Sequence, residues 1–330
     1  MGRGRRPRPA GLTECQRARV ALKASRKVSR GKTGPLKGTL VLPYTLVRYK
    51  AAVGWFFDWM SMQGIEVPGK TGEFDIIVME AIEWAWAEGE PRGLIGMCLS
   101  GLEYEVEGLR SQLRGSWKLW KHWGTQEFPT RVPPLSLDAT MVIASHMWKW
   151  GQPEAALSIL LAYHRFLRTS EFLKALVSHY LLPVGGREGH LLLSGTKTAT
   201  NDSITFSDPL LMDVLECLVR RRKPSDLFIK MSPYQFRLLF SSAVRASGLS
   251  ALFKPYSLRR GGASHFFRQT GNMARAMEVG RWRDIRTARI YINTALLSLA
   301  EDTSLSNPAL RVGARQFQRV LEHFVGAQGN

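Results

Sequence analysis

Cysteine is scarce in this chain, and its few cysteines are badly placed for cross-linking. The 330 residues contain only Cys15, Cys98 and Cys217, which are odd in number and far apart. This spacing offers neither a disulfide framework nor a CxxC metal pair, which fits a reducing compartment. No run approaches about 18 consecutive apolar residues, so we expect no membrane-spanning helix. The basic first residues are not followed by an apolar segment, so no secretory signal is expected.

Two further kinds of site find little support. The seven histidines show no ligand spacing with acids or cysteines, so no metal site is predicted. The pair Gly261-Gly262 lacks the lysine and the preceding strand of a phosphate-cradling loop. We expect these two glycines to let a helix pack closely against its neighbour.

What the chain has in excess is positive charge. Lysine and arginine number 46 against 27 acids, and the formal net charge is +19. Such an excess favours a polyanionic partner, above all nucleic acid, because cations that neutralise phosphates release condensed counterions. Many basic proteins bind no DNA, so charge alone leaves the partner open. The hydrophobic fraction of 45% and ten tryptophans suffice for packed cores, and the length allows two domains.

More than half of the excess charge lies in residues 1–38. This segment has twelve bases and the single acid Glu14, a net charge of +11. Because glycine and proline are scattered through it and large apolar residues are few, we expect a disordered basic arm. Three interpretations stay open: an arm that follows DNA phosphates, a nuclear-import signal, and a solvated tail with no specific role.

Residues 39–128 predict a helical domain, and residues 129–136 a linker. Apolar residues at helical spacing predict helices over 44–62, 74–86, 91–113 and 116–123. Trp117, Trp120 and Trp123 fall on one helix face, which favours packing in a core over stacking on nucleic acid. Three prolines between 129 and 134 block helix formation and stiffen the linker.

Residues 137–330 predict a second, larger domain. Two runs, 191–193 and 204–206, flank a polar segment and predict a β-hairpin. Helical patterns cover 137–150, 153–168, 209–221, 233–247, 258–270, 272–279, 286–299 and 312–324. The predicted fold class is therefore mainly α with a small β-sheet, as a helical domain followed by an α+β domain.

The most informative pattern lies near the C-terminus. The chain reads Tyr-Ser-Leu-Arg-Arg-Gly-Gly from Tyr256, Gly-Arg-Trp from Gly280 and Arg-Ile-Tyr from Arg289. Trp282 follows Arg259 by 23 residues and Tyr291 follows Trp282 by 9. This order and spacing resemble the C-terminal signature of the tyrosine recombinases, the phage-integrase family of DNA strand-exchange enzymes.

The resemblance extends upstream and covers roughly residues 135–300. The run Phe-Leu-Arg-Thr-Ser-Glu-Phe from Phe166 resembles the family's first arginine motif. It implies that Arg168 binds phosphate and that Glu171 orients the basic cluster. Lys197, at the polar tip of the predicted hairpin, matches the family's hairpin lysine. The preceding helical block stands where the family has its core-binding domain.

The implied catalytic residues are Arg168, Lys197, Tyr256, Arg259, Trp282 and Tyr291, and each residue type suits its role. Strand cleavage passes through a pentavalent phosphate whose oxygens gain negative charge. Guanidinium groups stay charged and offer a planar fork of donors to such oxygens. Tyr291 is the implied nucleophile, forming a 3′-phosphotyrosine. Lys197 is the implied general acid for the departing 5′ oxygen, and Trp282 is the implied donor of an indole N–H to a phosphate oxygen.

One position departs from the family pattern. Three residues before Arg259 the family usually has a histidine, and this chain has Tyr256. A phenol with an ordinary pKa near ~10 donates a hydrogen bond to phosphate but is a poor base at neutral pH. Either Tyr256 serves as a phosphate donor and water or another group accepts the proton, or the site is weakened.

The resemblance implies a site-specific recombinase or integrase, possibly of the eukaryotic mobile-element type. It would act on double-stranded DNA as a homotetramer, its two domains closing as a clamp, without metal, ATP or other cofactor. In relatives a C-terminal helix docks on the neighbouring subunit, and 312–324 is the corresponding segment. The alternatives are an inactive DNA-binding protein on the same fold, motivated by Tyr256, and a type IB topoisomerase. The expected location is the nucleus if the host is eukaryotic and otherwise the cytoplasm.

Overall fold

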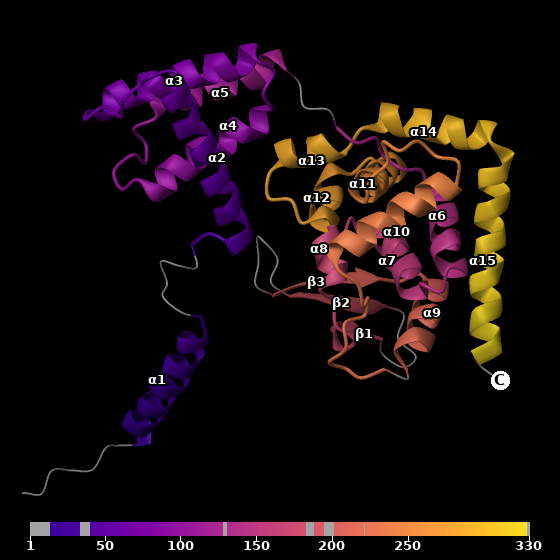
Figure 1. Ribbon diagram of the computed structural model, residues 1–330. Helices are drawn as coiled ribbons and strands as arrows, with labels where there is room; N and C mark the ends of the chain where they lie inside the picture. Colours follow the sequence, from indigo (N-terminus) through magenta and orange to yellow (C-terminus); the bar gives the residue numbers. More distant parts are fainter. Residues whose placement is uncertain are drawn as a thin grey trace, which may run out of the picture. The chain divides into compact units, whose positions relative to one another are not determined.

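A computed structural model of the chain describes residues 14–33, 40–127, 131–182, 188–194, 201–220 and 222–328 (Figure 1). The chain divides into two compact units, residues 1–130 and 131–330. Each unit has its own hydrophobic core, and each is described here by itself.

The first described element is helix α1 (Glu14–Thr33). The expectation of a disordered arm is therefore wrong for residues 14–33, while the rest of 1–38 lies outside the described residues. The prolines and most glycines of the arm lie outside this stretch, and alanine, arginine and lysine within it are strong helix formers. Five exposed cations share one side of the helix: Arg19, Lys23, Arg26, Lys27 and Arg30.

Four more helices build the first unit. They are α2 (Pro43–Met62), α3 (Thr71–Ala87), α4 (Arg92–Glu105) and α5 (Arg114–Gln126). Helix α2 packs against α4, and α3 packs against α5. The predicted helix over 91–113 was too long: α4 ends at Glu105, because Gly108 and Ser111 adopt positive φ angles of 95° and 68° that no helix accommodates.

The core of the first unit is aromatic. Phe56 and Trp59 stack, and Phe74 meets Phe56 edge to face. Trp123 is buried, while the partly buried Trp117 and Trp120 pack against the same cluster. The interpretation of the three tryptophans as core residues is confirmed.

The second unit begins with helices and a small sheet. Its first elements are α6 (Leu137–Lys149), α7 (Pro153–His164), α8 (Thr169–Leu173), the 3-10 helix η2 (Val177–His179), β1 (Tyr180–Leu181), β2 (Gly189–Ser194) and β3 (Asn201–Phe206). The strands form one antiparallel sheet in the order β1-β2-β3, with Leu191 opposite Ile204. The predicted hairpin and the predicted fold class, mainly helical with a small sheet, are confirmed.

The remaining elements are helices. They are α9 (Pro209–Val219), α10 (Pro233–Ala246), α11 (Tyr256–Thr270), α12 (Met273–Gly280), α13 (Ile285–Tyr291), α14 (Thr294–Ser306) and α15 (Pro308–Gln328). The single helix predicted over 286–299 is two helices, because the chain extends at Ile292. Asn293 then caps α14, its side-chain oxygen accepting the Leu296 N–H at 2.9 Å.

Helix α7 forms the centre of the second unit. Its residues from Ala155 to Tyr163 are all buried, and α6, α8, α9 and α11 pack around it. Helix α11 comes unusually close. A Cβ on Gly262 would overlap the Tyr163 carbonyl oxygen, and one on Gly261 would overlap that of Leu135. The two glycines therefore permit close packing, as the sequence predicted.

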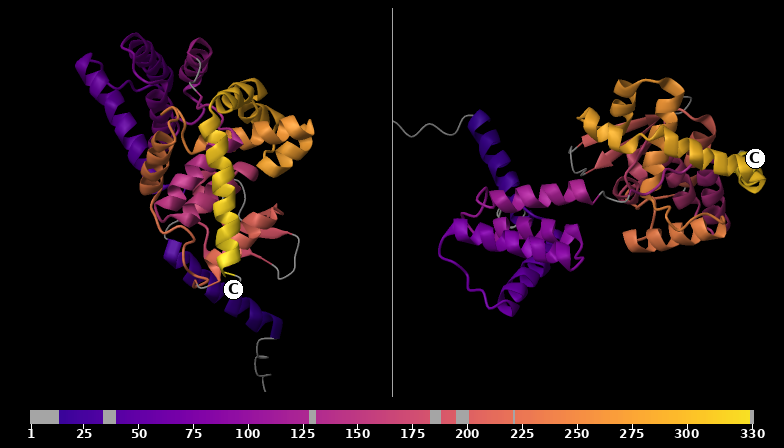
Figure 2. Two further views of the ribbon diagram at one scale, coloured as in Figure 1. Left: turned by 90° about the vertical axis from the view of Figure 1, so that its right-hand side faces the viewer. Right: turned by 90° about the horizontal axis from the view of Figure 1, so that it is seen from above.

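Helix α15 lies along its own unit (Figure 2). It packs against α6 and α9. Its residues Leu310, Ala314, Phe317 and Leu321 are buried, and Trp148 of α6 meets Phe317 edge to face at 6.0 Å. In this chain the segment expected to dock on a neighbouring subunit is covered by its own unit.

Gly262→Ala tests the close approach of α11 to α7. We expect it to lower the free energy of unfolding by roughly 3 kcal/mol, because the added methyl group meets backbone rather than a side chain that can move. Urea unfolding monitored by circular dichroism measures the loss. The matched control is Gly326→Ala in α15, where a Cβ meets open space and we expect no loss. Equal stability of both variants would contradict this account.

Candidate active site

Three aromatic residues of the predicted site meet in the second unit. Tyr291 is the last residue of α13, and Trp282 follows the end of α12. Their rings stack at 4.8 Å with an interplanar angle of 25°. The ring of Tyr256, the first residue of α11, lies 5.5 Å from that of Tyr291. The fold thus brings together residues that are up to 35 positions apart in the sequence.

Arg259 lies beneath these rings. Its guanidinium carbon is 5.0 Å from the Tyr291 ring centroid and 5.1 Å from that of Trp282. The neighbouring Arg260 instead donates to the Val132 carbonyl at 2.6 Å and so holds the start of the unit. The two adjacent arginines therefore have different roles, and Arg259 is the one in the site.

The Arg259 side chain is almost completely buried, with 1% of the residue exposed. Nη2 donates to the Gly280 carbonyl at 2.7 Å, and Nη1 donates to the Phe166 carbonyl. Burial first, and then the positive charge of Arg168, lower its pKa to about 10, so it remains a cation at neutral pH. Among the described atoms, its Nε has no hydrogen-bond partner. The guanidinium is oriented by carbonyls and keeps donors for an anion.

Arg168 is held by two contacts with Glu171. Arg168 is the N-cap of α8, and its Nη1 donates to Glu171 Oε1 at 2.7 Å. The backbone N–H of Arg168 donates to Glu171 Oε2, also at 2.7 Å. The Glu171 side chain is 3% exposed. A buried carboxylate with two such bonds fixes the direction in which Arg168 points.

A third arginine, which the sequence analysis did not select, completes the cluster. Arg281 Nη2 donates to Glu171 Oε2 at 2.7 Å. Its Nε lies 3.4 Å from Asp202 Oδ2 on β3, and its Nη1 donates to the Val279 carbonyl at 3.3 Å. Its position beside Trp282 was the only sequence signal, because Glu171 is 110 residues away. The cluster contains three guanidiniums and two carboxylates.

Two residues beside this cluster have a left-handed backbone conformation. Three non-glycine residues among those described have positive φ, and two of them are Phe166 (50°) and Arg281 (54°). Such a conformation costs a residue with a Cβ roughly 1–2 kcal/mol. At Phe166 it ends the stretch predicted as one helix over 153–168, so Arg168 starts α8 instead of ending α7. Both residues lie where the chain supplies a group to the arginine cluster.

Tyr256 is a neutral donor at physiological pH. Burial first, and then a side-chain hydrogen bond with Tyr291, raise its pKa well above the usual range for a phenol. It stays protonated through the neutral range, so it can donate a hydrogen bond but cannot accept the nucleophile's proton.

Trp282 offers a second unused donor. The residue is 6% exposed, and its ring stacks on Phe166 at 6.0 Å as well as on Tyr291. Among the described atoms, its indole Nε1 is buried without a hydrogen-bond partner. A buried N–H without a partner is costly, and an anion's oxygen is one group that would satisfy it.

Lys197 belongs to residues 195–200 and lies outside the described residues. The structure therefore places Arg168, Glu171, Tyr256, Arg259, Trp282 and Tyr291 in one region and leaves Lys197 unplaced. Within the described ranges no three His, Cys, Asp or Glu residues gather in a way that could hold a metal ion. No helix in those ranges has both the length and the apolar character that crossing a membrane requires.

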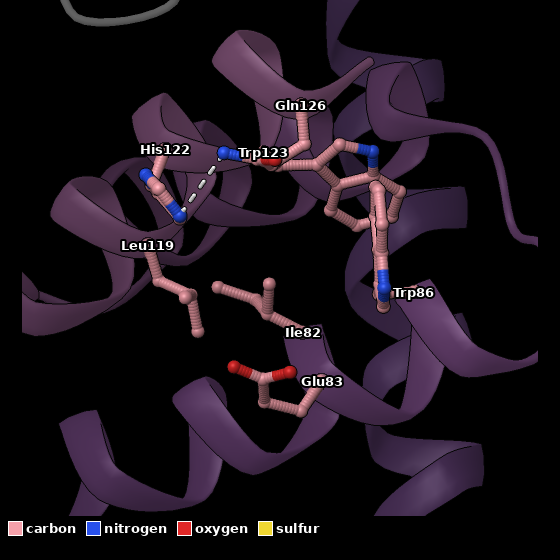
Figure 3. Close-up of a pocket in the computed structure, with 7 residues that line it drawn as sticks. All are labelled: Ile82, Glu83, Trp86, Leu119, His122, Trp123 and Gln126. Carbon is pink, nitrogen blue, oxygen red and sulfur yellow. Dashed lines mark hydrogen bonds between the residues drawn. The ribbon is translucent and has the colours of Figure 1, made fainter.

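A separate pocket lies in the first unit, between α3 and α5 (Figure 3). It has a volume of about 240 Å³, and Trp86 meets Trp123 edge to face in its wall at 5.2 Å. Its lining residues are Ile82, Glu83, Trp86, Leu119, His122, Trp123 and Gln126. None of the predicted site residues is among them, so the arginine cluster of the second unit stays the candidate active site.

Comparison with known proteins agrees with the fold of the second unit. Residues 145–296 match the model of the phage integrase family. No curated protein sequence matches the chain. Among solved structures, a lambda integrase fragment (residues 75–356), as a dimer bound to a COC′ core site, is similar with a TM-score of 0.50 and 15% identity, over 83% of this chain and 94% of that one.

Two other similar structures give lower scores. The XerH site-specific recombinase bound to difH has a TM-score of 0.44 and 13% identity, over 72% of this chain and 79% of that one. The catalytic domain of bacteriophage HP1 integrase has a TM-score of 0.39 and 22% identity, over 54% of this chain and 99% of that one. At such identities a structural likeness shows the fold alone. The second unit has the fold of a tyrosine recombinase catalytic domain, and its residues 145–296 match the model of the phage integrase family.

Proposed function

We propose that this chain is a site-specific recombinase that cleaves and rejoins double-stranded DNA through a 3′-phosphotyrosine at Tyr291. One observation carries the proposal. In a domain that matches the phage integrase family, a tyrosine ring lies against a buried arginine with unused donors and against an indole whose N–H has no partner among the described atoms. A phosphodiester supplies both the electrophile for the tyrosine and the oxygens for these donors.

In the first step the Tyr291 hydroxyl oxygen attacks the scissile phosphorus. The new bond joins Tyr291 to the 3′ phosphate, the bond from phosphorus to the 5′ oxygen breaks, and the phenol proton passes to water. Lys197 supplies a proton to the 5′ oxygen as it leaves. The second step reverses these transfers with the 5′ hydroxyl group of another strand. The phosphotyrosine conserves the bond energy, so neither ATP nor a metal is invoked.

The arginines stabilise the charge that develops on the phosphate. Arg259 and Arg168 would bind its non-bridging oxygens, and fixed cations in a buried site act more strongly than in water. Trp282 would donate its unpaired N–H to the same phosphate. Tyr256 replaces the usual histidine as a neutral donor, which follows from its raised pKa. Proton acceptance from Tyr291 therefore falls to water.

The proposed partner is double-stranded DNA, and the proposed working form is a homotetramer on two synapsed sites. The net charge of +19 supports a polyanionic partner. The five exposed cations on one side of α1 favour the same partner. The lambda integrase and XerH structures are described as bound to their DNA sites.

Tyr291→Phe tests the nucleophile. The full chain is incubated with short duplexes of randomised sequence that each carry one nick, so that cleavage releases a short strand and becomes irreversible. We expect a covalent protein–DNA adduct that peptide mapping places on Tyr291 and that Tyr291→Phe abolishes, because only the phenol oxygen can attack. Tyr234→Phe, which changes an exposed tyrosine of α10, is the matched control and keeps the adduct.

The other outcomes separate the alternatives. DNA binding without any adduct across the pool identifies an inactive DNA-binding protein. An adduct together with relaxation of supercoiled plasmid that lacks a second site identifies a type IB topoisomerase. An adduct on Tyr256 overturns the assignment of roles.

Substitutions of Tyr256 test its role as a neutral donor. We expect Tyr256→Phe to slow cleavage about 100-fold, the usual effect of losing one donor to a developing oxyanion. The pH profile should keep its shape, because the wild-type phenol does not titrate between about pH 5 and 8. Tyr256→His should add a rise in rate as pH increases through about 6.5, where imidazole becomes a neutral base. Single-turnover cleavage measures the rates; a wild-type inflection that Tyr256→Phe removes would contradict this role.

A further inference from the structure

We infer that Arg281 is a positioning residue that holds Glu171 and, through it, sets the direction of the phosphate-binding guanidinium of Arg168. The inference rests on the proposed function for its catalytic consequence. Its structural part, the restraint of Glu171 by Arg281, stands independently of that function.

Each of the three guanidinium nitrogens of Arg281 already has a partner within the protein. Its Nη2 and Nε face Glu171 and Asp202, and its Nη1 donates to the Val279 carbonyl. The side chain is 11% exposed. A guanidinium whose two carboxylate partners compensate its charge is a poor phosphate ligand, so Arg281 acts through its neighbours.

Glu171 needs a second cation. Its Oε1 accepts from the Arg168 side chain, and its Oε2 accepts from both the Arg168 N–H and Arg281. Of these three donors, only the one from Arg281 belongs to a residue other than Arg168. Without it, both remaining bonds of the nearly buried carboxylate come from Arg168 itself, so Glu171 and Arg168 can shift together and Oε2 is held less firmly.

The backbone at Arg281 supports a role beyond packing. Arg281 follows α12 in the left-handed conformation, its N–H donating to the Glu278 carbonyl and the next N–H, of Trp282, donating to that of Met277. Glycine fits this helix ending without strain. An arginine persists in such a position where its surroundings hold it, and such strain gathers at functional sites. The carboxylates of Glu171 and Asp202 hold the Arg281 side chain in this position.

The same backbone geometry provides a clean test. Arg281→Gly removes the side chain and at the same time relieves the conformational strain, so a loss of activity cannot be attributed to a distorted helix end. Arg281→Lys keeps the charge but loses the planar fork that reaches both acids. Arg275→Ala removes an exposed cation from the same helix and is the matched control.

The first measurement needs no DNA. The backbone N–H of Arg168 donates to Glu171 Oε2, so its hydrogen-exchange rate reports how firmly Glu171 is held. We expect exchange at Arg168 to become at least about tenfold faster in Arg281→Gly, with a smaller increase in Arg281→Lys and none in Arg275→Ala. Unchanged exchange in Arg281→Gly overturns the inference, whether or not the chain cleaves DNA.

The second measurement is a double-mutant cycle on single-turnover cleavage of the trapped nicked duplex. We expect Arg281→Gly to slow cleavage roughly 100-fold in the wild-type chain, because a small misplacement of a catalytic group has effects of that size. In an Arg168→Ala background the same substitution should have almost no further effect. Equal effects in both backgrounds would show that Arg281 does not act through Arg168. Absence of cleavage by the wild type instead counts against the proposed function, and exchange at Arg168 then decides the inference.

Discussion

The second unit depends on one constraint: three positively charged guanidinium groups lie close together and largely out of contact with water. Burial first, and then the nearby positive charges of Arg168 and Arg281, lower the pKa of Arg259. Among the described residues, the carboxylates of Glu171 and Asp202 balance the charge of Arg168 and Arg281. Burying a cation is costly unless hydrogen bonds and opposite charges compensate it. The compensation comes from backbone carbonyls at Arg259 and from carboxylates at the other two arginines. The net positive charge that remains is what an incoming phosphate would neutralise.

The backbone is shaped to supply those carbonyls. Phe166 and Gly280, whose carbonyls receive the two Nη donors of Arg259, lie at the ends of α7 and α12. Helix α11 can present Arg259 to both only because it approaches α7 closely at Gly262. The left-handed residues Phe166 and Arg281 turn the chain sharply at the same two places. The close packing of α11 against α7 and the orientation of the Arg259 guanidinium therefore depend on the same parts of the backbone.

The sequence predicted the residues whose signals are local. The helical periodicities, the hairpin around Leu191 and Ile204, and the spacing that joins Arg259, Trp282 and Tyr291 all lie within short windows. The roles of those residues stay predictions. Arg281 was not identified from the sequence, because its partners Glu171 and Asp202 are remote in the sequence and no local pattern marks its left-handed backbone. The helix over residues 14–33 was not predicted, because the expectation rested on the composition of the whole arm and not on this stretch of good helix formers. Helices α13 and α14 were predicted as one helix, because apolar periodicity does not reveal that Asn293 caps a new helix.

The way α15 packs has a consequence for how copies of this chain can associate. Its apolar side, with Phe317 and Leu321, is already covered by α6 and α9 of its own unit. A second copy that offered the same helix to this surface would have to displace the resident one. Association by that route would exchange one set of contacts for a nearly equivalent set, so it would bury little additional apolar area. Its equilibrium would depend on the short connection before Pro308 and on the local concentration of chains.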